Sequence, residues 1–145
     1  MAEGKNIFLV CPVRDLSEEE KKEIESYKES LEETGHEVYY PPEDTDQSDP
    51  YGLNICLENK EGLKRADEVH VYWNEKSRGS LHDLGMVTMA EKPLRLINRE
   101  ELEFTEGKSF TNVLLLRDSL TRGELPSGVG KERLEEIEEY LEGLY

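Results

Sequence analysis

Asn6-Ile-Phe-Leu-Val-Cys11 is an almost unbroken apolar run of strand length near the start of the chain. Such a run favours a strand that is covered on both faces, as the strands of a parallel sheet are. Ser17-Glu18-Glu19-Glu20 then forms a capping box for a helix, and Gly35 ends that helix as a left-handed cap. Residues 36–40 are rich in β-forming side chains. Strand, helix and strand with short connections predict a right-handed βαβ unit.

The same alternation continues through the middle of the chain. The run Val113-Leu-Leu-Leu116 fits either a fifth strand or part of a buried helix, because periodicity alone does not separate the two. We expect one α/β domain over residues 1–145, a flavodoxin-like or Rossmann-like three-layer sandwich around a parallel sheet of four or five strands. The further elements that we expect are strands over 68–73 and 94–97 and helices over 53–66, 80–90 and 131–144.

Two of these helices carry a glycine inside an apolar pattern. In the helix over 53–66, we expect Leu53, Cys56, Leu57 and Leu63 to face the core. Gly62 weakens the prediction of this helix unless it permits close packing, and Gly85 is expected to let the third helix approach the sheet.

Composition excludes several classes of function. The 145 residues carry a formal net charge of -16, which argues against nucleic acid as a partner because phosphates are bound by clustered Lys and Arg. No segment approaches the roughly 18 apolar residues that span a bilayer, and the amino terminus lacks the apolar stretch of a secretory signal. Cys11 and Cys56 lack metal-type spacing. We therefore expect reduced thiols, no metal site, no membrane partner and a cytoplasmic protein.

Ligands of doubly wound sheets bind beyond the carboxyl ends of the strands, near the point where strand order reverses. That rule selects the loops over 11–16, 41–52, 74–80 and 98–108, of which 41–52 is acidic, contains proline and is a candidate lid. Arg14 in the first loop suits bidentate binding of an anion, and the alternative is a surface arginine paired with an acidic neighbour.

The most informative stretch is Ser77-Arg-Gly-Ser-Leu-His-Asp-Leu-Gly85. A polar loop that leads into a helix directs backbone N–H groups and the positive end of the helix dipole at a possible anion. Asp83 lies about one turn into this helix, so its carboxylate is expected at the same place. His82 would point roughly 100° away around the helix, and we do not expect it to act as a catalytic base.

From residue 7 to about residue 97, the chain resembles the nucleoside 2-deoxyribosyltransferase-like family. This family includes transferases that exchange bases on deoxynucleosides and hydrolases that cleave deoxynucleoside 5′-monophosphates. The resemblance implies a nucleoside or nucleotide substrate and a homodimer in which the neighbour completes each site, and we expect no cofactor. It rests on Ile7-Phe-Leu-Val-Cys-Pro12, Glu32-Glu-Thr-Gly-His-Glu-Val38, Leu63-Lys-Arg-Ala-Asp67, Gly79-Ser-Leu-His-Asp-Leu-Gly85 and Ala90-Glu-Lys-Pro93.

The resemblance places Asp83 at the family's catalytic glutamate, which attacks the anomeric carbon and forms a covalent glycosyl–enzyme intermediate. It places Asn59 at an acidic residue that assists the departure of the base. Both positions depart from the family, because aspartate is one methylene shorter than glutamate and asparagine donates a hydrogen bond but no acidic proton. The substrate-binding residues that we expect are Arg14, Ser77, Gly79, Ser80 and Asp67.

Two functions of different classes follow from this pattern. In the first, the chain cleaves or transfers the N-glycosidic bond of a nucleoside or nucleoside 5′-monophosphate, with a carboxylate nucleophile. In the second, it is a catalytically inactive nucleotide-binding protein or sensor of the same fold. Only the enzyme needs Asp83 within attack distance of the anomeric carbon. A third interpretation, an interaction module whose acidic helices bind a basic partner, is supported by charge alone.

Overall fold

The computed structural model describes residues 3–124 and 129–142. Its centre is a sheet of four parallel strands in the order β2-β1-β3-β4. The chain runs from β1 out to β2 and then crosses back to β3, so the strand order reverses between β1 and β3. The strands are β1 (Asn6–Val10), β2 (Glu37–Tyr39), β3 (Glu68–Val71) and β4 (Leu94–Leu96).

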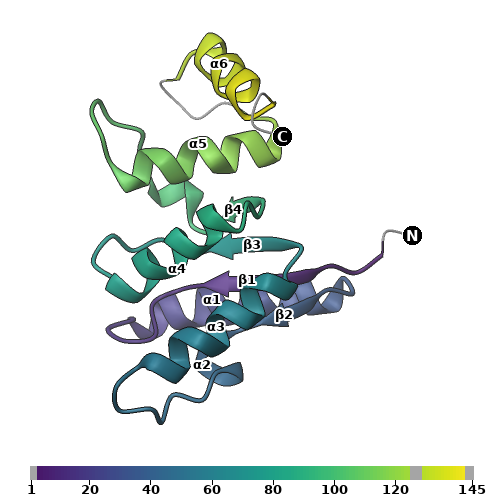
Figure 1. The fold of residues 1–145 in the computed structure, drawn as a ribbon, viewed down its shortest axis with the longest axis vertical. Coiled ribbons are helices and arrows are strands. Elements are labelled where there is room, and N and C mark those ends of the chain that lie inside the picture. Colours follow the sequence, from purple (N-terminus) through teal and green to yellow (C-terminus); the bar gives the residue numbers. More distant parts are fainter. Residues whose placement is uncertain (1–2, 125–128, 143–145) are drawn as a thin grey trace.

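Helices cover both faces of this sheet (Figure 1). One face carries α1 (Glu18–Glu33), and the other carries α3 (Leu53–Arg65) and α4 (Arg78–Met89). This arrangement confirms the predicted flavodoxin-like α/β fold, with four parallel strands in the described part of the chain. The remaining elements are α2 (Pro41–Asp44), the 3₁₀ helix η1 (Arg99–Glu101), α5 (Phe110–Arg122) and α6 (Lys131–Glu142).

The run at 113–116, which the sequence left open between strand and helix, belongs to α5. Ser109 begins this helix, because its hydroxyl accepts a hydrogen bond from the backbone N–H of Asn112 at 3.0 Å. Gly123 ends it in a left-handed conformation with φ of 72°. α5 packs beside β4, and α6 stacks beyond α5 (Figure 1). The predicted final helix ran to residue 144, and its last two positions lie outside the described residues.

The apolar run that opens the chain is buried on both faces, as predicted. Phe8 and Val10 point into the cluster beneath α3 and α4, and Ile7 and Leu9 point into the cluster beneath α1. The capping box at Ser17 is also present, with the Ser17 hydroxyl accepting from the Glu20 N–H at 3.1 Å. The buried strand and the capped start of α1 therefore bound the loop that follows β1.

The prediction for the inward face of α3 is wrong in part. Leu63 is buried, but Leu53 and Leu57 are 65% and 48% exposed. The buried positions of this helix are Asn59, Gly62 and Leu63. The helix is rotated because a polar residue, Asn59, finds hydrogen-bond partners inside, which apolar periodicity does not detect.

The two helical glycines differ in their surroundings. A Cβ on Gly62 would lie 3.1 Å from the Phe8 ring and 3.2 Å from the Tyr39 ring, so this glycine permits close packing of α3 on the sheet. Gly85 is exposed and has no atom within 4 Å of an added Cβ. The prediction that Gly85 brings α4 close to the sheet is therefore wrong.

No helix among the described residues is long and apolar enough to cross a bilayer.

Candidate active site

A cleft of about 500 Å³ lies beyond the carboxyl ends of β1 and β3, where the strand order reverses. Residues 11–15 after β1 and residues 74 and 76–79 after β3 form two of its walls, and Asn59 and Asp83 contribute from α3 and α4. A larger hollow of about 790 Å³ lies beside α5, away from these strand ends. The smaller cleft is the candidate site, because it is the place where doubly wound sheets bind ligands and it gathers the polar residues.

Asp83 is the buried carboxylate of this cleft. It lies in the second turn of α4 and is 9% exposed. Burial raises the pKa of Asp83 to about 6, while the neighbouring His82 and a hydrogen bond from Asn59 act in the opposite direction. The imidazole Nδ1 of His82 lies 3.8 Å from the Asp83 carboxylate. Above pH 6 the cleft therefore holds an ionised carboxylate in a partly desolvated position, which is suited to nucleophilic attack.

Asn59 is held from behind by a hydrogen-bonded chain. Its Oδ1 accepts from the Thr45 hydroxyl at 2.7 Å, and the Thr45 hydroxyl lies 2.6 Å from the hydroxyl of Tyr39. With Oδ1 occupied, the amide NH₂ is left for the cleft that Asn59 and Asp83 both line, and Asn59 acts to lower the pKa of Asp83. The sequence predicted Asn59 at the site but gave no sign of Thr45 or Tyr39, because both act through contacts between distant elements.

The segment after β2, a candidate lid from the sequence, is tied down by its own hydrogen bonds. It begins with the short helix α2, and the backbone N–H of Asp46 donates to Glu58 of α3 at 2.9 Å. Asp49 accepts from the backbone N–H of Asn54 at 2.7 Å. The segment carries Thr45 to Asn59, and its Pro41 lines the cleft.

Three basic side chains line the cleft: Arg14 from the loop after β1, and Lys76 and Arg78 on either side of Ser77. None of the three has an ion-pair partner among the described residues. Three cations without ion-pair partners in one cleft of a chain with net charge -16 make that cleft chemically suited to bind an anion. From the sequence, Arg14 is predicted as a binding residue, whereas Lys76, which precedes the stretch over 77–85, and Arg78, which lies within it, were given no role.

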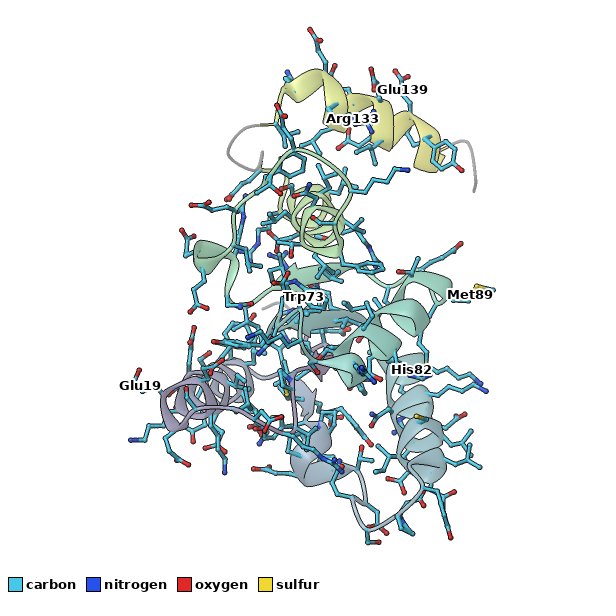
Figure 2. The ribbon with its side chains drawn as sticks, turned by 90° about the vertical axis from the view of Figure 1, so that its left-hand side faces the viewer. Glu19, Trp73, His82, Met89, Arg133 and Glu139 are labelled. Atoms are coloured by element: carbon cyan, nitrogen blue, oxygen red, sulfur yellow. The ribbon has the colours of Figure 1, made fainter. Side chains whose placement is uncertain are left out.

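The start of α4 faces the same cleft. Ser77 is the N-cap, and its hydroxyl accepts from the backbone N–H of Ser80 at 3.2 Å. Ser77 and Gly79 line the cleft, whereas Ser80 is 1% exposed and does not. His82, which helical geometry predicts to point away from Asp83, also lines the cleft. Figure 2 shows His82 on α4 and Met89 projecting outward from the other end of that helix.

Asp67 is not part of this cleft, which corrects its place among the expected substrate-binding residues. It precedes β3 and accepts a hydrogen bond from the backbone N–H of Asn6 at 2.8 Å. Both residues lie at the amino ends of their strands, so Asp67 is at the edge of the sheet opposite the cleft. Because Asp67 precedes the strand expected over 68–73, the sequence already placed it at the amino end of that strand, where the strand-end rule expects no ligand.

Cys11 lines the cleft without being a candidate nucleophile. The thiol is 5% exposed. Burial, with a smaller contribution from the charge of Asp83, raises the pKa of Cys11 to about 12. A thiol of this kind stays protonated at neutral pH and is unreactive. In the described part of the chain, no three His, Cys, Asp or Glu side chains are placed to hold a metal ion.

Comparison with known proteins finds similar solved structures but no match by sequence. No family model matches the chain, and no curated protein matches it by sequence. Among solved structures, it is similar to the 2-deoxyribosyltransferase of the psychrotolerant bacterium Bacillus psychrosaccharolyticus, with 25% identity, a TM-score of 0.53, and coverage of 62% of this chain and 69% of that one. It is also similar to the CMP N-glycosidase BcmB of Clostridium botulinum, with 22% identity, a TM-score of 0.52, and coverage of 92% and 98%.

Proposed function

We propose, from the nucleoside 2-deoxyribosyltransferase-like family that these structural likenesses support, that the chain cleaves or transfers the N-glycosidic bond of a nucleoside 5′-monophosphate. The observation that carries the proposal is that one cleft holds both the buried carboxylate of Asp83 and three basic side chains, Arg14, Lys76 and Arg78. A buried carboxylate supplies the nucleophile, and the unpaired cations supply the binding site for a phosphate.

Asp83 acts in two displacements. In the first, its carboxylate oxygen forms an ester bond to the anomeric carbon as the bond from that carbon to the base nitrogen breaks, and the base leaves with the bonding electrons. In the second, water or another base attacks the same carbon, the ester bond breaks and Asp83 returns to its ionised form, and the attacking group loses its proton to solvent. Asn59 has no acidic proton to give, so the departing base takes its proton from solvent. The amide of Asn59 instead aims the carboxylate by a hydrogen bond.

The basic residues favour a 5′-monophosphate over an uncharged nucleoside. A guanidinium binds phosphate oxygens with two parallel hydrogen bonds, and the amino end of α4 adds backbone N–H groups and the positive end of its dipole. Ser77 at the N-cap offers a hydroxyl beside Arg78. The carboxylate of Asp15 lines the same cleft and repels an anion only weakly, because it is exposed to solvent.

We also propose that the chain forms a homodimer through the outer face of α4. Leu84 and Val87 of this helix are buried in the core, whereas Leu81 and Met89 are 38% and 86% exposed and flank the exposed Gly85. A second copy would cover these apolar side chains beside the cleft. Sedimentation of the wild type and of Met89→Glu checks this: the wild type should sediment as a dimer and the variant as a monomer, and two monomers would contradict it.

Release of free base tests the function. The purified protein is incubated with ribo- and deoxyribonucleosides and their 5′-monophosphates, and free base is followed by chromatography. We expect release from at least one monophosphate and, for the matching nucleoside, a rate lower by about 10- to 100-fold, the value of one or two charge-assisted contacts. Transfer is then detected by adding a second base.

A sensor is the second candidate, favoured by the two departures from the family pattern at Asp83 and Asn59. If a monophosphate raises the melting temperature while no base is released, the cleft binds without turnover and the sensor replaces the enzyme. If neither base release nor a shift in melting temperature occurs with any compound, both nucleotide functions are wrong.

A further inference from the structure

The amide of Asn59 has two ways to face Asp83, and they have opposite chemical effects. With its NH₂ toward the carboxylate, Asn59 donates a hydrogen bond that favours the ionised form of Asp83. With its oxygen toward the carboxyl, it accepts a hydrogen bond from the protonated form and favours that form instead. Which orientation holds is therefore decided by the groups on the far side of the amide.

The far side of the amide is occupied by Thr45, which is 4% exposed and ends α2. The Thr45 hydroxyl lies 2.7 Å from Oδ1 of Asn59. A hydroxyl has one proton, and the hydroxyl of Tyr39 lies 2.6 Å from the same Thr45 oxygen. If Tyr39 donates to Thr45, then Thr45 has its proton free to donate to Asn59, and Asn59 must accept on that side. The Tyr39 hydroxyl, the Thr45 hydroxyl and the Asn59 NH₂ then each donate in the direction of Asp83.

We propose that Thr45 is a positioning residue, which, with its hydroxyl oriented by Tyr39, holds the Asn59 amide as a hydrogen-bond donor to Asp83 in both protonation states. The inference rests on the proposed function for its purpose, because a nucleophile must be ionised to attack. The geometry itself does not depend on which substrate binds. It also assigns a role to the segment after β2, which brings Thr45 to α3.

Other titratable groups face Asp83 and are unaltered when Thr45 is changed. His82 precedes it on α4, and the thiol of Cys11 lies at the end of β1. The remaining titratable or charged groups of the cleft are Arg14, Asp15, Cys56, Lys76 and Arg78. A change in the titration of Asp83 on substitution of Thr45 or Tyr39 therefore reports on the amide of Asn59.

Two conservative substitutions remove the control of the amide. Thr45→Val keeps the volume but loses the hydroxyl, so the amide can rotate and accept from protonated Asp83. Tyr39→Phe keeps the ring, which stacks on Phe8 with centroids 5.1 Å apart, but frees the Thr45 hydroxyl to turn. Both should make protonation of Asp83 easier, Thr45→Val by more. Thr45→Ser, which retains the hydroxyl, is the matched control.

The experiment follows the side-chain NH₂ signal of Asn59 by ¹H–¹⁵N NMR as a function of pH, in the full chain without substrate. In the wild type, this signal should change near pH 6, and the change should vanish in Asp83→Asn. We expect the midpoint to rise by about one pH unit in Thr45→Val, by less in Tyr39→Phe, and to stay at the wild-type value in Thr45→Ser. The acid limb of the rate of base release should move by the same amounts.

An unchanged midpoint in both Thr45→Val and Tyr39→Phe overturns the proposal, even if either variant is less stable, because a merely structural role lowers stability without moving this titration. Should Thr45→Val fail to fold, Tyr39→Phe decides alone. Because the NMR titration needs no turnover, a shifted midpoint in a protein that releases no base upholds the positioning role while the proposed function fails.

Discussion

A buried carboxylate lies toward each end of the sheet, and the two are treated in opposite ways. Glu68 begins β3 at the amino edge and is 6% exposed, while Asp83 faces the cleft at the carboxyl edge and is 9% exposed. Burial raises the pKa of both. For Glu68, hydrogen bonds from Lys5 and Arg95 outweigh burial and hold the pKa at about 2. For Asp83, burial dominates and the pKa is about 6.

The difference lies in where the cations are placed. At Glu68, the Lys5 ammonium sits 2.9 Å from one carboxylate oxygen and Arg95 binds the other. At the cleft, Arg14 and Arg78 form no ion pair with an acidic residue in the described part of the chain, although the buried carboxylate of Asp83 lines the same cleft. A fully paired carboxylate stabilises the fold. A buried carboxylate without a cation bound to it is typical of a catalytic group, which is the role proposed for Asp83.

The largest expected effect is a difference in enzymatic activity between variants of the two carboxylates. Asp83→Asn removes the nucleophile, and we expect the rate of base release to fall by at least about 10³-fold. Glu68→Gln lies outside the cleft and should retain the rate within about threefold at 25 °C. Steady-state kinetics with the best monophosphate of the panel measures both. Equal losses of rate in the two variants would contradict the proposal that Asp83, and not Glu68, is the catalytic carboxylate.

The same two variants should change stability with opposite signs. The native state binds the Asp83 proton more tightly than the unfolded state does. The contribution of Asp83 to the free energy of unfolding therefore falls as pH rises from about 4 to 6. Asp83→Asn should therefore match the wild type below pH 4 and exceed it by about 2 to 3 kcal/mol above pH 6.

Glu68 follows the reverse rule. Because its pKa is lowered, its contribution is present above about pH 4.5 and is lost as pH falls toward 2. Glu68→Gln should be less stable than the wild type at pH 7 by about 1 to 2 kcal/mol, since both cations remain partly in water, and the difference should shrink in acid. Urea unfolding at several pH values measures both variants. A loss of stability in Asp83→Asn at pH 7 would speak against the comparison.

The cations give the smallest and most specific contrast. Arg78→Gln should weaken binding of a monophosphate by about tenfold and leave the unfolding free energy unchanged. Arg95→Gln should do the reverse, lowering the unfolding free energy by about 1 kcal/mol without affecting binding. Calorimetric titration and urea unfolding check the pair. If Arg78→Gln binds the monophosphate as tightly as the wild type, the cleft does not hold its phosphate there.

The sequence predicted the sheet and the main site because both follow from local patterns. A continuous apolar strand, a capping box and a left-handed glycine defined the first βαβ unit, and the strand-end rule then located the cleft. Asp83, Asn59, Arg14, Ser77 and Gly79 all reach that cleft. Lys76, just before the stretch over 77–85, and Arg78, within it, were given no role because each, taken alone, is an ordinary surface residue.

What could not be predicted depends on contacts between distant elements. Gly62 and Gly85 are equivalent in the sequence, yet one lies against Phe8 and Tyr39 and the other is open to solvent. The hydrogen bonds from Tyr39 through Thr45 to Asn59 join β2, the end of α2 and α3. No periodicity or motif marks such a chain, because its members meet only in the folded protein.

The most direct test of this account is the titration of Asp83 and Glu68 themselves, followed by the ¹³C signals of their side-chain carboxyl groups and assigned with Asp83→Asn and Glu68→Gln. We expect Asp83 to titrate near pH 6 and Glu68 near pH 2. If Asp83 instead titrates below pH 4 with Glu68, both carboxylates are structural, and the cleft has no carboxylate set apart for catalysis.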